Sequence, residues 1–554
     1  MKSKKFFTMI LFILILGAAF FVRVYKLGQI PAGVYTDEAS LGYNAYSLLL
    51  TGKDEFGKSW PVYFRAFSTF QDSLYGYFSV IPVYFLGLSI FSTRLVSVIS
   101  GLTVVLVSFL IVYWSDLKKK SNLALLAAFT VAFSPWAIYQ SRVAVGSNLG
   151  LGLTAVGILF LFLSLNKRWF FVLACSILGL ASYAYAGQRI TSILFPIVFV
   201  LINKKFFLKP RKWALVGFAL LILIMLPQFK GLSSAGSLVR YQTQGYTQKS
   251  TFEKHGGPLI KIPVLGRSIY IARQFTSQYL SVLSPRSLFF EPEPQLVRSI
   301  PDLSTFYVWM IIPFFAGLVQ VWKKRSHVFI QITFLLLAIG ALPEALTGDP
   351  FYTLRMLPYL WGITLVIALG IDSLLTKIQN NLVKWTLAAI VVVLTGFNFY
   401  TAYFIFLKHE RSIWYGYPFQ VLAEFTEENS NQKFVLDSEI YDAPYIWMAF
   451  YKKLDPKKLQ AQAPPGLLEH YYDDLTYYKY KVVGNVEVRK INWGLDPCQD
   501  EYIIGDIAAI GDAQAVEHKL SLIREIKDLS NKTILWIFHT NPELKCSQKS
   551  ESEK

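Results

Sequence analysis

The chain has 554 residues, of which 54% are hydrophobic and only 16% are charged, and its formal net charge is +18. Soluble globular chains carry about 25% charged residues, so this composition excludes an ordinary soluble protein and predicts an integral membrane protein. The excess of Lys and Arg does not indicate nucleic acid as a partner, because these residues lie in short loops between apolar runs.

The N-terminus is a basic start, Met1 to Lys5, followed by an apolar run that reaches Val22. No small-residue cleavage pattern follows, so we expect an uncleaved first span rather than a signal peptide. A span needs about 20 apolar residues. On this basis we expect an all-α polytopic membrane domain with about 11 transmembrane helices, at 6–26, 93–115, 121–139, 148–165, 169–186, 190–203, 213–229, 304–322, 327–346, 353–375 and 385–407.

The basic residues predict the orientation of these spans. A cytoplasmic N-terminus places nearly all short basic segments inside, as the positive-inside rule requires, and leaves Arg142 and Arg189 in short outer loops. We therefore expect a multi-pass protein of the plasma (inner) membrane. The expected inner residues are Lys2, Lys4, Lys5, Lys118, Lys119, Lys120, Lys167, Arg168, Lys204, Lys205, Lys209, Arg211, Lys212, Lys323, Lys324, Arg325, Lys377 and Lys384.

One further apolar segment, residues 74–90, has the hydropathy of a span. If it crossed the membrane, every later basic cluster would lie outside, so we expect it to form an interfacial helix on the outer leaflet; Pro82 and its aromatic residues fit this. Residues 27–92 then form one long outer loop with interfacial helices. A second outer loop covers 230–303, and both belong to a membrane domain of residues 1–407.

Residues 408–554 are expected to form an extracytoplasmic domain of mixed α/β structure. Cys498 and Cys546 both fall in it, and they could pair if the region is exported, but sequence does not determine connectivity. Period-two and apolar patterns predict strands or strand-like runs at 433–437, 480–490, 502–507 and 533–538, and a helix at 417–428.

The first candidate for chemistry is the acidic pair Asp37-Glu38. It opens an apolar-faced segment, residues 39–50, with Thr36 as the expected N-cap, so both carboxylates lie in the first helical turn. The helix dipole favours their charged forms there, and an ionised carboxylate at the membrane surface could accept a hydroxyl proton. The alternative is that two acids at a helix start only complement the dipole.

The second candidate is a group of four arginines at the outer boundary of the membrane. Arg94 and Arg355 lie at the starts of spans, and Arg142 and Arg189 lie in tight outer turns. Arginine stays charged and binds phosphate bidentately, which suits an anionic lipid phosphate; the alternative is that each side chain only extends to the lipid headgroups. Aromatic residues in the same turns, Tyr183 and Tyr185 among them, are also expected at an interface for membrane reasons alone.

No P-loop, dinucleotide-binding glycine motif, HExxH or CxxC is present in the sequence, and the six histidines show no metal-ligand spacing. These absences argue against a nucleotide-hydrolysing enzyme.

The ordered set of motifs resembles GT-C fold glycosyltransferases, in particular the bacterial relatives of protein O-mannosyltransferases and aminoarabinose transferases. The resemblance covers roughly residues 5–360 and runs through these motifs in order: Arg23, the Pro31–Glu38 segment, Arg94, Ser134-Pro-Trp, Ser141-Arg142, Tyr183/Tyr185 with Arg189, Tyr279 to Phe290, and Leu342 to Pro358.

The resemblance implies a membrane glycosyltransferase that moves a sugar, with inversion, from a polyprenyl- or dolichyl-phosphate donor to an acceptor hydroxyl at the outer face. Asp37 would be the catalytic carboxylate and Glu38 would support it. Arg94, Arg142, Arg189 and Arg355 would bind the donor phosphate, and Tyr183, Tyr185 and Tyr352 would line the substrate site.

Three matters are left open by the resemblance. Many relatives have a histidine where Tyr352 stands, and family members differ in their need for a divalent cation. The acceptor could be a protein, a lipid or a glycan.

Two other functional classes also remain open: a polytopic transporter or flippase for a lipid-linked sugar, and an outer-face binding or assembly protein that uses 408–554. A transporter would favour internal repeats and midplane charges, which the sequence does not show.

Overall fold

The computed structural model of the chain describes residues 2–115, 117, 120–207, 211–232, 246–262, 265–348, 351–439, 443–474, 476 and 478–546. The expected inner residues Lys118, Lys119 and Lys209 lie outside this part of the chain. The structure divides into two compact units, the first formed by residues 1–25 and 94–403 and the second by residues 26–93 and 404–554. Residues 26–93, expected as a loop of the membrane domain, thus group with the C-terminal residues.

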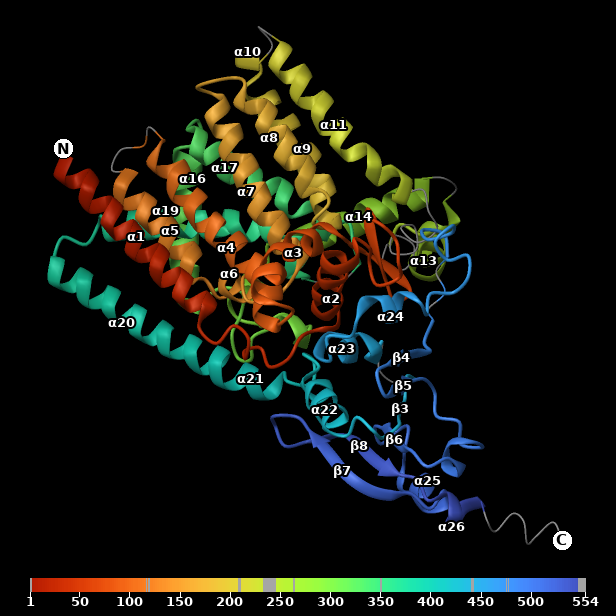
Figure 1. Cartoon of the computed structure of the whole chain (residues 1–554). Coiled ribbons are helices and arrows are strands. Elements are labelled where there is room, and N and C mark those ends of the chain that lie inside the picture. The colour runs from red at the N-terminus through yellow and green to blue at the C-terminus, as the bar shows by residue number, and fades with distance from the viewer. Residues whose placement is uncertain are drawn as a thin grey trace. The chain divides into compact units, whose positions relative to one another are not determined.

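The first unit is helical, and its helices are drawn in Figure 1. They are α1 (Lys2–Val24), α4 (Ile90–Tyr113), α5 (Lys120–Phe133), α6 (Pro135–Gln140), α7 (Gly146–Ser164), α8 (Phe170–Ala181), α9 (Ala186–Ile202), α10 (Lys204–Phe207), α11 (Lys212–Leu232), α13 (Lys249–His255), η1 (Gly257–Lys261), α14 (Leu265–Ser281), α15 (Pro285–Phe289), η2 (Leu296–Arg298), η3 (Val308–Met310), α16 (Ile311–Lys323), α17 (Val328–Gly340), α18 (Leu342–Ala345), η4 (Thr353–Arg355), α19 (Leu357–Leu375) and α20 (Asn381–Phe399).

Within the described residues, seven helical segments are long and apolar enough to cross a membrane, and the chain is a multi-pass membrane protein. Four other expected spans, at 121–139, 169–186, 190–203 and 304–322, are helical but shorter than 18 residues. The first of these is interrupted because Pro135 lacks the N–H that would continue the helix, so α5 ends at Phe133 and α6 begins at Pro135. The expected number of about eleven is therefore not confirmed.

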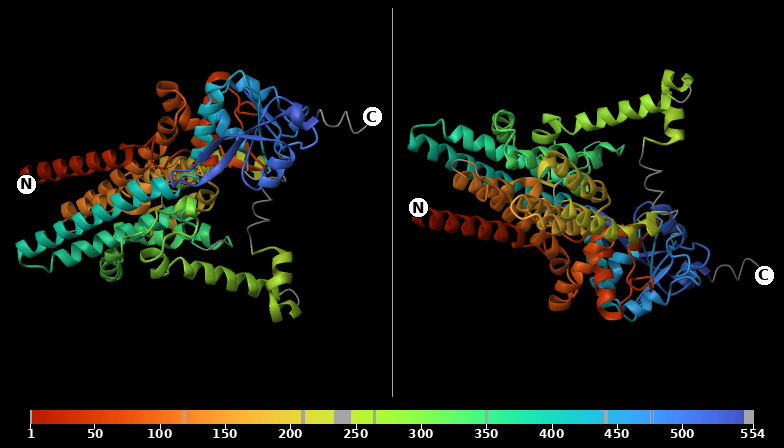
Figure 2. Two further views of the ribbon diagram at one scale, coloured as in Figure 1. Left: turned by 90° about the horizontal axis from the view of Figure 1, so that it is seen from below. Right: turned by 90° about the horizontal axis from the view of Figure 1, so that it is seen from above.

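Among the seven helical segments long enough to cross a membrane, α19 is the most enclosed, and every residue from Leu357 to Gly370 is buried. It packs against α5, α16 and α17, and Figure 2 gives two further views of the helices of this unit. Its contact with α16 is close: a Cβ added at Gly370 would lie 1.7 Å from the carbonyl oxygen of Pro313. Glycines at such positions let two membrane helices approach backbone to backbone.

The second unit is a mixed α/β structure. Its elements are α2 (Thr36–Thr51), β1 (Tyr63–Ala66), β2 (Thr69–Asp72), α3 (Leu74–Leu86), α21 (Leu407–Glu410), α22 (Tyr417–Glu428), β3 (Phe434–Leu436), α23 (Pro444–Tyr451), α24 (Pro456–Gln460), β4 (Lys481–Val483), β5 (Val486–Val488), η6 (Asp496–Cys498), β6 (Tyr502–Gly505), α25 (Asp512–Glu517), β7 (Ser521–Lys527), β8 (Thr533–His539) and α26 (Pro542–Cys546). The π-helix η5 (Tyr400–Phe406) contains the point in the sequence at which the first unit ends and the second resumes.

Its main sheet has the order β4-β5-β3-β6-β8-β7, with β3 parallel to β5 and β6 and the other pairs antiparallel. Alternate residues of β3 enter two cores: Phe434 and Leu436 face one, and Val435 faces the other. The first core also contains Ala39 and Tyr43 of α2. Helix α2 is therefore part of the folded core of this unit.

The expected strands at 433–437, 502–507 and 533–538 are confirmed as β3, β6 and β8, and the expected helix at 417–428 is α22. The run at 480–490 is not one strand but the hairpin β4-β5, because the chain turns at Gly484, whose φ is +65°. Strand β7 was not expected. Of its seven residues only Ile526 is buried, so the alternation that reveals a half-buried strand is absent.

Helix α3 occupies the segment expected as an interfacial helix. It packs against α2 and leaves large apolar side chains exposed, among them Ile81, Tyr84 and Phe85. An apolar exposed face of this kind is typical of a helix that lies at a membrane surface.

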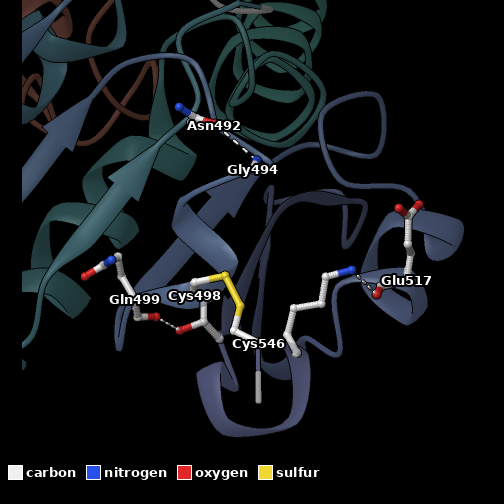
Figure 3. The surroundings of a disulfide bond; sticks show 8 residues. Asn492, Gly494, Cys498, Gln499, Glu517 and Cys546 are labelled. Atoms are coloured by element: carbon white, nitrogen blue, oxygen red, sulfur yellow. Dashed lines mark hydrogen bonds between the residues drawn. A yellow bond between two sulfur atoms is a disulfide. The ribbon is translucent and has the colours of Figure 1, made fainter. Parts of the chain in front are cut away.

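The structure resolves the question of the two C-terminal cysteines. Cys498 at the end of η6 is joined by a disulfide to Cys546 at the end of α26 (Figure 3). The Nζ atom of the neighbouring Lys545 donates to the carbonyl oxygen of Glu517, 2.8 Å away, so the last helix is held to the domain by two links. Disulfides persist in oxidising compartments.

Candidate active site

The segment before the acidic pair is fixed by backbone contacts with the C-terminal part of the second unit. Gly33 has a φ of +89° and forms a β-bridge with Gly416. Val34 is held on both sides, since its N–H donates to the Tyr451 hydroxyl at 3.1 Å and its carbonyl oxygen accepts from Trp447 Nε1 at 2.8 Å. These contacts fix where α2 begins, and therefore where its first turn presents the acidic pair.

The two carboxylates of the pair differ in their surroundings. Glu38 is 1% exposed, and its Oε2 accepts a hydrogen bond from the backbone N–H of Tyr35 at 3.0 Å. It thus acts as the carboxylate half of a capping box, and the N-cap is Tyr35, one residue before the expected Thr36. Asp37 is half-buried and lies in the same first turn. Asp37 is therefore the more exposed carboxylate of the pair.

A buried acidic pair that sequence reasoning did not single out lies just beyond the end of α2. The Glu55 carboxylate accepts from Asn44 Nδ2 at 3.1 Å and from the Tyr445 hydroxyl at 3.0 Å. The neighbouring Asp54 accepts from the Tyr471 hydroxyl. Burial raises the pKa of Glu55 to about 7 and that of Asp54 to about 6. The hydrogen bonds from Tyr445 and Tyr471 join residues 26–93 to residues 404–554.

In the first unit, the ring of Tyr352 makes cation–π contacts with two arginine side chains. The guanidinium carbons of Arg298 and Arg355 lie 3.4 Å and 4.0 Å from its ring centre. Arg355 also donates from Nη1 to Thr347 Oγ1 at 2.7 Å and lies 3.9 Å from the Glu344 carboxylate. Glu344 in turn accepts from the backbone N–H of Tyr352 at 2.9 Å. Two of the expected residues, Tyr352 and Arg355, are thus brought together, and Arg298 and Glu344 join them.

Arg298 has its own carboxylate partner. Glu293 Oε1 accepts from Arg298 Nε at 2.8 Å, and Thr353 donates to the other oxygen of Glu293. Burial raises the pKa of the Glu293 carboxyl, and the positive charge of Arg298 opposes that shift. A cavity of about 30 Å³ adjoins these residues and is large enough for a water molecule.

Arg189 lies in the first turn of α9, half-buried, and its Nε donates to Gln228 Oε1 at 3.0 Å. Helix α9 packs against α18, the helix of Glu344: a Cβ added at Gly187 would lie 3.1 Å from Pro343 Cβ. Arg189 thus lies on a helix that packs against the helix of Glu344, the carboxylate partner of Arg355. Of the two tyrosines in this turn, Tyr185 is the N-cap of α9, and Tyr183 donates from its hydroxyl to the carbonyl oxygen of Ile224 at 2.6 Å.

The other two expected arginines are fully buried. Arg142 donates from Nη1 to the carbonyl oxygens of Val22 and Arg23, at 2.7 Å and 3.0 Å, and from Nε to the Tyr403 hydroxyl at 3.0 Å. Such a set of protein acceptors is typical of a structural arginine. Arg94 lies in α4 with no exposed surface. A phosphate role for these two arginines stays a prediction, and their burial favours the half-buried Arg189 and Arg355 for direct contact.

Among the described residues, no group of three His, Cys, Asp or Glu side chains lies close enough together to hold a metal ion.

The architecture is shared with a protein of known structure. No family model matches the chain, and no curated protein matches it in sequence. Among solved structures, ArnT from Cupriavidus metallidurans bound to undecaprenyl phosphate matches over 97% of this chain and 98% of its own, with a TM-score of 0.54 and 11% identity. The archaeal oligosaccharyltransferase AglB from Archaeoglobus fulgidus, in complex with an inhibitory peptide and a dolichol-phosphate, matches over 91% and 70%, with a TM-score of 0.48 and 13% identity.

The match to ArnT extends over both compact units, because it covers nearly the whole of each chain. The fold implied by the sequence resemblance, the GT-C fold, is thereby confirmed, and it includes the C-terminal region, which the resemblance in sequence did not reach.

Proposed function

We propose that this chain is a membrane glycosyltransferase that moves a sugar from a polyprenyl- or dolichyl-phosphate donor to an acceptor hydroxyl. The single observation that carries the proposal is the different burial of the two acidic residues. Glu38 is buried and caps the helix, which leaves Asp37 as the accessible carboxylate in the first turn of α2. The shared fold with ArnT, which was solved with undecaprenyl phosphate bound, supports a lipid-phosphate donor.

The reaction is a single displacement at the anomeric carbon. The acceptor oxygen forms a bond to that carbon while the bond from the carbon to the phosphate oxygen breaks, and the configuration inverts. Asp37 accepts the proton of the acceptor hydroxyl, a role that contributes about 10²- to 10⁴-fold in rate. The electron pair of the broken bond stays on the leaving polyprenyl phosphate.

Negative charge grows on the leaving phosphate, so fixed guanidinium groups would stabilise the transition state. Arg355 and Arg189 are the first candidates, because they are half-buried rather than enclosed. Tyr352 would keep Arg355 in place through the ring contact at 4.0 Å, and Glu344 would orient it through its carboxylate, 3.9 Å away.

We further propose that the second unit is extracytoplasmic, with a cytoplasmic N-terminus, in the plasma (inner) membrane. The Cys498–Cys546 disulfide supports this side, since cytosolic thiols are kept reduced. The distribution of Lys and Arg supports the same orientation. The transferred sugar would be a hexose or a pentose, and a protein, lipid or glycan would be the acceptor.

The test is a transfer assay with the purified full chain in liposomes, supplied with a panel of polyprenyl-phosphate-linked hexoses and pentoses. The proposal expects one free polyprenyl phosphate for each sugar transferred. Movement of intact lipid-linked sugar across the bilayer with no release of polyprenyl phosphate would instead identify a flippase and overturn the proposal.

A further inference from the structure

A cleft of about 550 Å³ opens in the second unit, at the end of α2 that is far from Asp37. One wall is the loop that follows α2, with Lys53 and Phe56, and the other is α24 and the turn after it, with Lys457, Gln460, Pro464 and Glu469. Helix α24 packs against α2 (Figure 1). The volume is within the range of about 300–1,000 Å³ that is usual for small-molecule sites.

The two walls are fixed to each other by hydrogen bonds. Gln460 Nε2 lies within 3.0 Å of three acceptors: Ser47 Oγ and Thr51 Oγ1 at the end of α2, and the carbonyl oxygen of Asp54 in the loop that follows. Behind the first wall, Asp54 Oδ1 accepts from the backbone N–H of Phe56 and of Lys58 and so holds the loop in its turn. The cleft is therefore a preformed feature, which reduces the entropy lost when a ligand binds.

The charges of the cleft are predominantly positive. Lys53 and Lys457 are exposed, and among the described residues neither has a carboxylate within ion-pair distance. Glu469 is the one acidic side chain among the residues that line the cleft. Two unpaired ammonium groups on facing walls favour a ligand that carries carboxylate or phosphate groups.

The second wall also limits the kind of ligand. An extended peptide binds a protein edge chiefly through backbone hydrogen bonds. Here the backbone N–H groups of Lys458, Ala461 and Ala463 all donate within the wall, to Asp455, Lys457 and Gln460. Pro464 and Pro465, which follow, have no N–H. The wall therefore offers the Lys457 ammonium and the apolar rings of Pro464 and Pro465, which suits the anionic groups and the apolar faces of an acidic sugar.

We infer that this cleft binds an anionic oligosaccharide segment of the acceptor, and this inference rests on the proposed transferase function. The 16 residues of α2 separate the cleft from the first turn by roughly 20 Å. A ligand in the cleft therefore does not supply the reacting hydroxyl itself. It anchors an extended acceptor whose far end is glycosylated, so the cleft selects long, acidic glycans over short or neutral ones.

The experiment measures binding, by fluorescence anisotropy, of a labelled oligogalacturonide to the full chain in detergent at low ionic strength. A neutral maltooligosaccharide of equal length and an oligoglutamate peptide of equal charge are the comparison probes. The test variant is Lys53→Glu with Lys457→Glu. The matched control is Lys490→Glu with Lys532→Glu, which makes the same change in charge at exposed lysines that do not line the cleft.

We expect the oligogalacturonide to bind the wild-type and control chains, and binding to weaken by about tenfold or more in the Lys53/Lys457 variant. The maltooligosaccharide and the peptide should bind the wild-type chain weakly. Their affinity should be no higher than that of the oligogalacturonide for the Lys53/Lys457 variant. Absence of binding to the wild-type chain, equal weakening in the control, or tighter binding of the oligoglutamate would overturn the inference.

The same material separates this inference from the proposed function. An Asp37→Asn chain should bind the oligogalacturonide as the wild type does. If the wild-type chain binds the probe but transfers no sugar, the proposed function fails and the cleft remains; if it transfers sugar and binds no probe, only the cleft inference fails.

Discussion

The backbone of Gly33 lies directly against that of Tyr415. A Cβ added at Gly33 would be 2.1 Å from the carbonyl oxygen of Tyr415, and the φ of +89° is one that other residues rarely adopt. This contact joins the segment that leads to Asp37 to the C-terminal residues of the same unit.

Replacing Gly33 by alanine should therefore destabilise the second unit by about 2–4 kcal/mol, from backbone strain and overlap together. The matched control is Gly52→Ala, because Gly52 has a φ of +68° but no atom within 4 Å of an added Cβ. That variant should lose only about 1 kcal/mol. Thermal unfolding of the purified chains measures both, and equal losses would contradict the packing described for Gly33.

The buried Glu55 makes stability depend on pH. Burial raises its pKa from the ordinary 4.5 to about 7; the charge of Asp54 adds to the shift, while hydrogen bonds from Asn44 and Tyr445 and the charge of Lys481 oppose it. The folded state thus holds the Glu55 proton more tightly than the unfolded chain, so this contribution is complete below pH 4.5 and is lost as pH rises to about 7. The loss is roughly 3 kcal/mol.

Glu55→Gln should remove that part of the pH dependence and raise stability at pH 8, because the amide stays neutral and keeps an acceptor for Asn44. Unfolding temperatures between about pH 5 and pH 8 test it against the wild type. Asp54, whose pKa is raised to about 6, leaves a smaller slope in the variant. An unchanged slope in Glu55→Gln would mean that Glu55 does not titrate in this range.

Arg355→Lys should raise the KM for the lipid-linked donor by about tenfold or more, because lysine supplies neither the planar contact with Tyr352 nor a bidentate phosphate contact. Arg286→Lys is the control: it makes the same exchange at an exposed side chain of α15. Steady-state kinetics with varied donor measure both variants. A donor KM within twofold of wild type for Arg355→Lys would remove Arg355 from the phosphate site.

Arg142→Lys should act on stability instead. The lysine cannot replace hydrogen bonds to Val22, Arg23 and Tyr403 at once, so we expect a loss of about 2–4 kcal/mol. Thermal unfolding and the donor KM are to be measured on the same preparation. Undiminished stability together with a raised donor KM would instead support the phosphate role that the sequence suggested for Arg142.

The features that sequence predicted well are local ones. The apolar runs indicated most of the helices, and the acidic pair beside a helix start indicated the first turn of α2, because each pattern is complete within about 20 residues. The hydrogen bond between Glu55 and Tyr445 joins residues 390 positions apart, and neither residue belongs to a local motif. The contact of Arg298 with Tyr352 is likewise long-range.

The expected division of the chain shows the same limit. Residues 26–93 have the composition of a loop with interfacial helices, and nothing within them indicates that Tyr43 packs into a core built around β3. The packing of Tyr43 depends on contacts with segments that are distant in the sequence. The sequence alone indicates only that an apolar residue lies on one face of a helix.

The most direct test of the account is the turnover number of Asp37→Asn beside that of Glu38→Gln, in chains shown to be folded by their unfolding temperatures. Glutamine keeps an oxygen that can accept from the Tyr35 N–H, so Glu38→Gln should lose less than about tenfold in kcat. Asp37→Asn should lose about 10²-fold or more, because asparagine cannot take up the acceptor proton. If Asp37→Asn transfers sugar at the wild-type rate, the carboxylate of Asp37 is not the base and the proposed reaction is wrong.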